Sequence, residues 1–304
     1  VARIELAAGQ PQRMAGAGEL ALNDMCEVYG FPADLKDKLV LKRLVIVKVE
    51  EDFKRVLGLP LMGIIPKLNR KRGAGNKPIV LDVHEDPRST IAEAYRSVRT
   101  ALRFATVHGL PRSLLITSAS PAEGKSTTAH ELARNIAQLG KRVVLVDADL
   151  RNPSVHKVTG LSSALGLSNL LAGARELRDV LQHLPQDNLS VITSGPLPPN
   201  PPELLAGDAL AKLLAQLREQ FDMVILDGPP VLGLADAPLL ANQAEATVLV
   251  AAADDTRNDC LKTAQQRLKA ARARLLGAVL TRFDLKRQGA GYGYTYYAYG
   301  GSSD

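Results

Sequence analysis

The chain has 304 residues, of which 46% are hydrophobic, so it is long and apolar enough to bury a full core as a globular protein. Its net charge of +6 resides in residues 1–112, which hold 19 Lys and Arg against 13 Asp and Glu, whereas the remaining residues hold 19 of each. Two cysteines, Cys26 and Cys260, are too few for a disulfide framework. No aromatic platform or recognition motif accompanies the basic residues, so we expect no nucleic acid partner.

The N-terminal third contains no catalytic motif. We assign no function to residues 1–47, and we interpret residues 48–88 as a basic linker. The most apolar run, residues 39–49, contains three basic residues and is far shorter than the ~20 residues that a membrane-spanning helix needs, so we expect no transmembrane segment in this chain. The charge of the linker suits the anionic surface of a membrane. Its basic cluster comprises Lys67, Arg70, Lys71, Arg72 and Lys77.

A helix is expected over residues 90–105, where Glu93, Arg96 and Arg99 recur at a spacing of three on one stripe. Such side chains can pair across a subunit boundary or within their own helix. A stripe of this kind is most often a solvated face that contributes a few tenths of a kcal/mol per pair. The residues alone leave both interpretations open.

A phosphate-binding turn is the strongest signal in the chain. An apolar strand over residues 113–118 leads into Gly124, Lys125 and Ser126, which open a helix over residues 127–139. Backbone N–H groups at a helix N-terminus favour anions, the glycine permits close approach, the lysine can reach the β- and γ-phosphates, and the serine hydroxyl can bind Mg²⁺. This pattern predicts a nucleotide-phosphate site.

The loop departs from the standard pattern, which has a glycine where this chain has Ala119. Gly-Lys-Ser also occurs by chance in many chains, but a strand before it and a helix after it are the confirming context. The residues expected to contact the nucleotide are Ser120, Ala122, Glu123, Gly124, Lys125, Ser126 and Thr127.

Three aspartates follow buried-type strands. Asp147 and Asp149 end a strand over residues 142–148, and Asp227 ends another over residues 221–227. Ligands of open parallel sheets bind at the carboxyl ends of the strands, so these carboxylates are expected beside the phosphate loop. Mg²⁺ takes few protein carboxylates, which leaves one free for proton abstraction. The alternative is that each aspartate only caps the helix or turn that follows.

Alternating strands and helices predict an α/β fold with a doubly wound, mostly parallel sheet. The expected strands are residues 113–118, 142–148, 189–193, 221–227, 246–252 and 276–281.

The C-terminal tail is rich in glycine and tyrosine and carries no charge over residues 289–301. We expect it to be mobile, as a phosphate acceptor must be if its hydroxyl is to reach a γ-phosphate. A low-complexity tail without function is the alternative. The candidate acceptors are Tyr292, Tyr294, Tyr296, Tyr297 and Tyr299.

Two motifs carry a family resemblance. Residues 145–151, Leu-Val-Asp-Ala-Asp-Leu-Arg, and residues 225–230, Ile-Leu-Asp-Gly-Pro-Pro, resemble the second and third Walker motifs of the bacterial tyrosine kinases (BY-kinases) of the capsular and exopolysaccharide chain-length regulators, or polysaccharide co-polymerases. The resemblance extends over residues 48–304. It implies a P-loop NTPase fold of the deviant-Walker (MinD/ParA-like) type.

The resemblance also implies roles. Lys125 and the loop backbone would hold ATP, Ser126 and Asp149 would bind Mg²⁺ with Asp227 acting directly or through water, and Asp147 would orient or deprotonate the incoming tyrosine. The two aspartates of residues 147–149 could exchange these roles. Thr281 stands where relatives commonly have an asparagine near the adenine, which leaves base selectivity open.

The implied activity is tyrosine autophosphorylation within a ring-like homo-oligomer, held together through Glu93, Arg96 and Arg99. The implied partners are a transmembrane activator segment or co-polymerase, a cognate tyrosine phosphatase and other tyrosine-containing protein substrates. The implied setting is the cytoplasmic face of the bacterial inner membrane, where the family regulates exopolysaccharide and capsule synthesis and export.

The expected organisation is an unassigned segment over residues 1–47, the basic linker over residues 48–88, a kinase domain over residues 89–285 and a tail over residues 286–304. One alternative is a ParA/MinD-like switch ATPase for partition or positioning. That branch carries an extra lysine at the position we align with Ser120, and its absence argues against it. A catalytically silent scaffold is disfavoured because Lys125, Ser126 and the three aspartates are all present.

Overall fold

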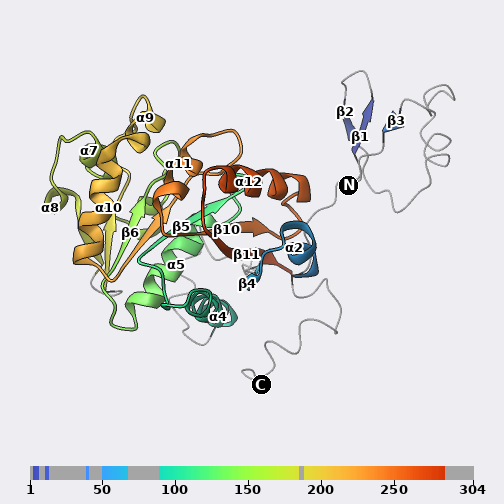
Figure 1. Ribbon diagram of the computed structural model, residues 1–304, viewed down its shortest axis with the longest axis horizontal. Coiled ribbons are helices and arrows are strands. Elements are labelled where there is room, and N and C mark those ends of the chain that lie inside the picture. Colours follow the sequence, from blue (N-terminus) through green and yellow to red (C-terminus); the bar gives the residue numbers. More distant parts are fainter. Residues whose placement is uncertain are drawn as a thin grey trace, which may run out of the picture. The chain divides into compact units, whose positions relative to one another are not determined.

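A computed structural model describes residues 3–6, 11–13, 39–40, 50–67, 89–184 and 188–284 (Figure 1). The chain divides into two compact units, Val1–Ile46 and Val47–Asp304. In the first unit, β1 (Arg3–Leu6) pairs in antiparallel fashion with β2 (Pro11–Arg13) and with β3 (Leu39–Val40). No helix within the described ranges is long and apolar enough to cross a bilayer.

The second unit is built on an eight-stranded sheet in the order β4-β11-β10-β5-β9-β6-β8-β7. Neighbouring strands are parallel except for β7, which is antiparallel to β8. This confirms the predicted α/β class. The strands are β4 (Leu61–Pro66), β5 (Ser113–Ser118), β6 (Val143–Asp147), β7 (Gln182–Leu184), β8 (Leu189–Ile192), β9 (Met223–Asp227), β10 (Ala246–Ala252) and β11 (Leu275–Phe283).

Helices cover both faces of this sheet, as a parallel sheet requires. Figure 1 shows α10, α11 and α12 above the sheet and α4 and α5 below it. The helices are α2 (Glu50–Leu57), α4 (Thr90–Phe104), α5 (Lys125–Ala137), α6 (Val155–Thr159), α7 (Leu167–Leu171), α8 (Leu177–Val180), α9 (Pro201–Ala206), α10 (Asp208–Gln220), α11 (Asp236–Gln243) and α12 (Asn258–Ala270).

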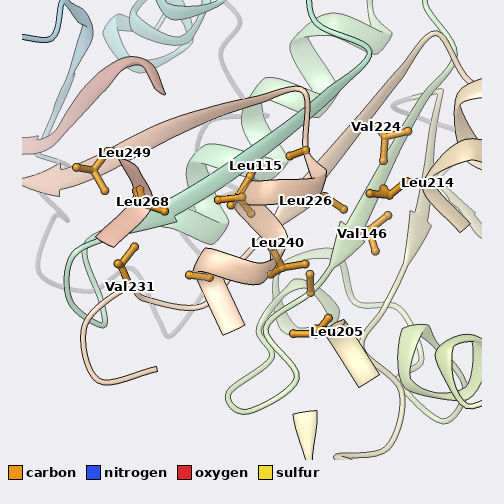
Figure 2. Packing of buried hydrophobic residues seen from close by; sticks show 14 of the residues in the cluster. Leu115, Val146, Leu205, Leu214, Val224, Leu226, Val231, Leu240, Leu249 and Leu268 are labelled. Carbon is orange, nitrogen blue, oxygen red and sulfur yellow. The ribbon is translucent and has the colours of Figure 1, made fainter. Parts of the chain in front are cut away.

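Each face has its own hydrophobic core, because successive side chains of a strand point to opposite sides. In β5, Leu115 packs with α10, α11 and α12, whereas Leu114 and Ile116 pack with α4 and α5. Figure 2 shows the first of these cores, with Leu240 of α11 directed toward the sheet beside Leu115 and Leu226. The central strands β5, β6 and β9 are fully buried, and their carboxyl ends are therefore held rigidly.

All six predicted strands are present, but α2, β4 and β7 were not predicted. Residues 48–88 were interpreted as a linker, whereas residues 50–66 form α2 and the edge strand β4, which pairs with β11. The reason is tertiary packing: the Phe53 side chain of α2 is fully buried, and α4 packs across β4. The rest of the linker, from residue 68 to residue 88, lies outside the described residues, and the predicted domain division stays a prediction.

Candidate active site

The predicted phosphate loop connects β5 to α5 at the carboxyl end of the sheet and borders a cavity of about 800 Å³. Strands β6 and β9, which flank one another and bring the three aspartates to the same edge, end beside it. Lys125, Ser126 and Asp149 line the cavity, whereas Asp147 and Asp227 are fully buried and do not line it. The topology thus places a cation, a hydroxyl and carboxylates where a nucleotide phosphate would bind.

The loop backbone is shaped by two left-handed residues, Ala122 with φ 63° and Gly124 with φ 94°. The turn at Gly124 starts α5 at Lys125, two residues earlier than predicted. No side chain caps the N-terminus of α5, so its first backbone N–H groups remain available to an anion. A side chain at Gly124 would also approach Thr281, because a Cβ there would lie 3.3 Å from Thr281 Cγ2.

Lys125 is held by two carboxylates. Its Nζ lies 2.9 Å from Asp149 Oδ2 and 3.6 Å from Asp227 Oδ1, and it also donates to the Ser126 hydroxyl at 3.3 Å. Burial alone would lower the pKa of Lys125, but the attraction of Asp227 and Asp149 outweighs it and raises the pKa above its usual value. The ammonium is therefore charged and fixed at the wall of the cavity.

The three aspartates have different surroundings. The Asp147 carboxylate accepts backbone N–H groups from Ser154 at 3.1 Å and Val155 at 2.9 Å, and burial together with the charge of Asp227 raises its pKa to about 7. Burial also raises the pKa of Asp227 against the attraction of Lys125, and within the described part of the chain neither Asp227 oxygen accepts a hydrogen bond of normal geometry. Asp149 is the one that faces the cavity.

The Glu123 carboxylate was predicted only as part of the phosphate loop, and it has a separate structural role. Buried and pointing away from the cavity, it accepts the Ser120 N–H at 3.0 Å and the Thr256 hydroxyl at 2.6 Å. Burial raises the pKa of Glu123. The Glu123 carbonyl accepts the Thr281 hydroxyl at 2.6 Å, so Thr281 braces the loop. Thr256 lies too far along the sequence for any local pattern to reveal this contact.

Sequence reasoning also missed an ion pair at the cavity. Arg151 donates from Nε to Asp236 Oδ2 at 2.8 Å and from Nη2 to Asp236 Oδ1 at 3.2 Å. Asp236 is fully buried at the start of α11. Arg151 lines the cavity with Lys125, Ser126 and Asp149.

The predicted interface residues lie on α4 and do not line the cavity. Glu93 and Arg96 form an exposed ion pair within the helix, and Arg99 Nη1 donates to the Asn135 carbonyl of α5 at 2.9 Å. The five candidate acceptors, Tyr292 to Tyr299, lie outside the described residues.

Comparisons with known proteins point to one family. A family model described as an AAA domain matches residues 121–274. The chain is 40% identical to the tyrosine-protein kinase YwqD of Bacillus subtilis over 227 residues, which are 75% of this chain and 95% of that protein. It is 37% identical to the tyrosine-protein kinase etk of Escherichia coli K12 over 69% of this chain, but it spans only 29% of that longer protein.

Comparison with solved structures points to the same family. The kinase domain of the Escherichia coli tyrosine kinase ETK is 34% identical, with a TM-score of 0.73 over 82% of this chain and all of that domain. The chimerical protein CapA2B2 is 37% identical, with a TM-score of 0.71 over 78% of this chain and all of the chimera.

Proposed function

Because this chain belongs to the bacterial protein-tyrosine kinases, we propose that it transfers the γ-phosphoryl group of ATP to the tyrosines of its own C-terminal tail. The observation that carries the proposal is the buried Lys125 ammonium, held by Asp149 and Asp227 at the uncapped start of α5. At this position the Lys125 ammonium and the backbone N–H groups of α5 can bind the phosphates of ATP together. The partition or positioning ATPase is set aside, because the curated proteins that the chain matches at 40% and 37% identity are named tyrosine-protein kinases.

The residues at this edge of the sheet fit Mg²⁺. Among the described residues, no hydrogen bond of normal geometry reaches the two buried Asp227 oxygens, which are the kind of acceptor that a cation satisfies. The Ser126 hydroxyl is a second oxygen ligand on the loop. The described residues contain no cluster of three or more His, Cys, Asp or Glu side chains that could hold a metal ion. Mg²⁺ usually keeps waters and takes further oxygens from substrate phosphates. When bound, Mg²⁺ would neutralise charge on those phosphates.

The aspartate roles left open by the sequence are better supported in their exchanged form. Asp147 does not line the cavity, but it is the register partner of Asp227 on the neighbouring strands β6 and β9, so the two carboxylates can share a cation. Asp149 lines the cavity beside Lys125, within reach of an incoming substrate. We therefore propose Ser126, Asp227 and Asp147 as the Mg²⁺ side of the site. Asp149 takes the role of proton acceptor.

The reaction then proceeds by in-line displacement. The phenolic oxygen of a tail tyrosine forms a bond to the γ-phosphorus, and its proton passes to the Asp149 carboxylate. The bond from the γ-phosphorus to the bridging β–γ oxygen breaks, which leaves ADP. Lys125 and the N–H groups at the start of α5 bind the phosphates throughout.

We further propose that acceptor and active site belong to different copies within a ring-like homo-oligomer. Glu93 is exposed and Arg96 is half-buried on α4, where the two form an ion pair at the surface, whereas Arg99 binds α5 of its own chain. Phosphorylated tails would repel one another and loosen the ring, because each phosphate adds close to two negative charges.

The biological setting rests on the family. The proposed partners are a transmembrane activator or polysaccharide co-polymerase and a cognate tyrosine phosphatase, at the cytoplasmic face of the inner membrane. The basic residues of the segment before α4 suit an anionic membrane surface. The proposed output is regulation of exopolysaccharide or capsule synthesis and export, with other tyrosine-containing proteins as further substrates.

The test is incubation of the purified chain with Mg-ATP, followed by intact and peptide mass spectrometry, beside the variant Lys125→Met. Several phosphates confined to Tyr292–Tyr299 in the parent and absent in the variant would support the proposal. ATP consumption with an unmodified tail would contradict it.

A further inference from the structure

Arg151 has a guanidinium group that is only partly used within the protein. Two of its five N–H donors bind Asp236, through Nε at 2.8 Å and Nη2 at 3.2 Å. Nη1 donates no hydrogen bond to any acceptor in the described residues, and the side chain is 40% exposed where it lines the cavity. One edge of the planar group is therefore anchored, and the other edge remains open.

The carboxylate that holds Arg151 is that of Asp236. Asp236 is fully buried, and both of its carboxylate oxygens are taken by Arg151. A buried carboxylate without its partner is costly, so Asp236 keeps the arginine in one orientation. A bidentate contact also fixes the plane of the guanidinium, which a lysine could not reproduce.

Three further cations, Lys67, Arg151 and Arg282, line the cavity with Lys125, and Arg151 is anchored by a buried carboxylate. Three carboxylates, Asp147, Asp149 and Asp227, meet beside the cavity, and the Lys125 ammonium is already engaged by two of them. Phosphoryl transfer spreads negative charge over three equatorial oxygens, which planar N–H donors stabilise well. Arg151 lines the same cavity as Lys125, Ser126 and Asp149.

We propose that Arg151 is a catalytic residue whose free edge binds the γ-phosphoryl group during transfer, and that Asp236 is the positioning residue that holds it. The inference deepens the proposed function, since it concerns the same site. The competing explanation is that the pair only fastens the loop after β6 to α11.

The chain offers a matched control for that competing explanation. Arg142 and Asp222 lie just before β6 and β9, at the opposite end of the sheet from the cavity. Arg142 also makes two bonds to one carboxylate, one from guanidinium Nη2 and one from its backbone N–H, each 2.9 Å from Asp222. Arg142→Ala removes an ion pair and a cation but leaves the cavity untouched.

The experiment compares the parent chain with Arg151→Ala, with Arg142→Ala and with the double variant Arg151→Met/Asp236→Asn. The double variant avoids leaving a buried charge unpaired, and circular dichroism establishes that each protein is folded. We expect kcat for tail phosphorylation to fall about 10²- to 10³-fold in both Arg151 variants and to change less than twofold in Arg142→Ala. A folded Arg151 variant that keeps kcat within threefold of the parent overturns the inference.

A binding measurement separates this inference from the proposed function. Isothermal titration calorimetry with Mg-ADP, alone and with aluminium fluoride as a mimic of the phosphoryl group in transfer, needs no tail acceptor. We expect both Arg151 variants to bind Mg-ADP within threefold of the parent and to lose at least tenfold in the affinity gained with aluminium fluoride. If the parent fails to phosphorylate its tail, the proposed function falls and this measurement still decides the role of Arg151. An unchanged gain in affinity excludes that role.

Discussion

Nζ of Lys125 lies 2.9 Å from Oδ2 of Asp149, so the cation of the phosphate loop is held in place by a carboxylate that follows β6. Less than a tenth of the surface of each side chain is exposed. The lysine is thereby ordered before any nucleotide arrives, which removes the entropy of fixing a long side chain from the cost of binding phosphate.

Replacing Lys125 by Met should therefore abolish most activity. We expect kcat for tail phosphorylation to fall at least 10²-fold, because the variant loses the fixed charge that faces the phosphates. Phosphotyrosine mass spectrometry after a timed reaction measures it. Lys141→Met, which alters an exposed lysine just before β6, should behave like the parent. Equal loss in both variants would show that the effect is not specific to the site.

The stability of the nucleotide-free protein should depend on Asp147. Its pKa rises from an ordinary value near 3.8 to about 7 on folding, so the folded state holds a proton that the unfolded state has lost between these pH values. The free energy of unfolding should consequently decrease as pH rises from about 4 to about 7. Asp147→Asn should abolish this loss and melt several degrees above the parent at pH 8.

Differential scanning fluorimetry between pH 4 and pH 8 tests this. Asp222 is the control, because hydrogen bonds from Arg142 lower its pKa. Its contribution to stability therefore has the opposite pH dependence and is lost as pH falls through the lowered pKa. An Asp147→Asn profile that runs parallel to that of the parent across this range would contradict the assignment. Mg-ADP should reduce the difference at pH 8, if Asp147 lies beside the cation.

The sequence predicted that Lys125 and the strand-end aspartates lie together, but it did not predict the residues that hold the site in place. Lys125 and Asp227 were predictable because a helix start and a strand end are local patterns, and the parallel order of β5, β9 and β6 brings them together. Asp236 and Thr256 were not predictable, because they meet Arg151 and Glu123 from 85 and 133 residues away. The edge strand β4 was missed because six residues containing a glycine and a proline give little strand signal.

Glu123 should act on nucleotide binding more than on chemistry. Ser120 N–H and the Thr256 hydroxyl donate to different oxygens of Glu123, and Glu123→Gln turns one of these oxygens into an NH₂ donor, so one of the two hydrogen bonds is lost. Losing one such bond costs about 1 kcal/mol, which predicts roughly a fivefold weaker affinity for Mg-ADP by calorimetry. Thr256→Val should weaken it to a similar extent, and the two changes together should cost less than their sum. A large fall in kcat with unchanged affinity would contradict a bracing role.

The α4 stripe makes a prediction about assembly. Reversing charge in Arg96→Glu/Arg99→Glu should lower the mass measured by light scattering, because a negative charge at position 96 would repel the acidic partner of a neighbouring copy. Arg103→Glu, at the exposed end of the same helix, is the matched control and should leave the mass unchanged. Since Arg99 also binds the Asn135 carbonyl, Arg96→Glu alone separates assembly from internal packing. An unchanged mass in both Arg96 variants would remove α4 from the interface.

The place of β4 in the sheet can be tested at Gly63. A Cβ at this position would lie 2.4 Å from Val98 Cγ2 of α4, and Val98 is fully buried. Gly63→Ala should therefore force β4 and α4 apart and lower the free energy of unfolding by about 1–3 kcal/mol in urea. Gly207→Ala is the control, because a Cβ there meets nothing closer than 3.7 Å and its φ of −74° suits alanine. Adding Val98→Ala should relieve the clash, so the double variant should lose less than the two single costs combined. Strictly additive costs would mean that β4 does not pack against α4, and the segment before residue 67 would return to the linker that the sequence suggested.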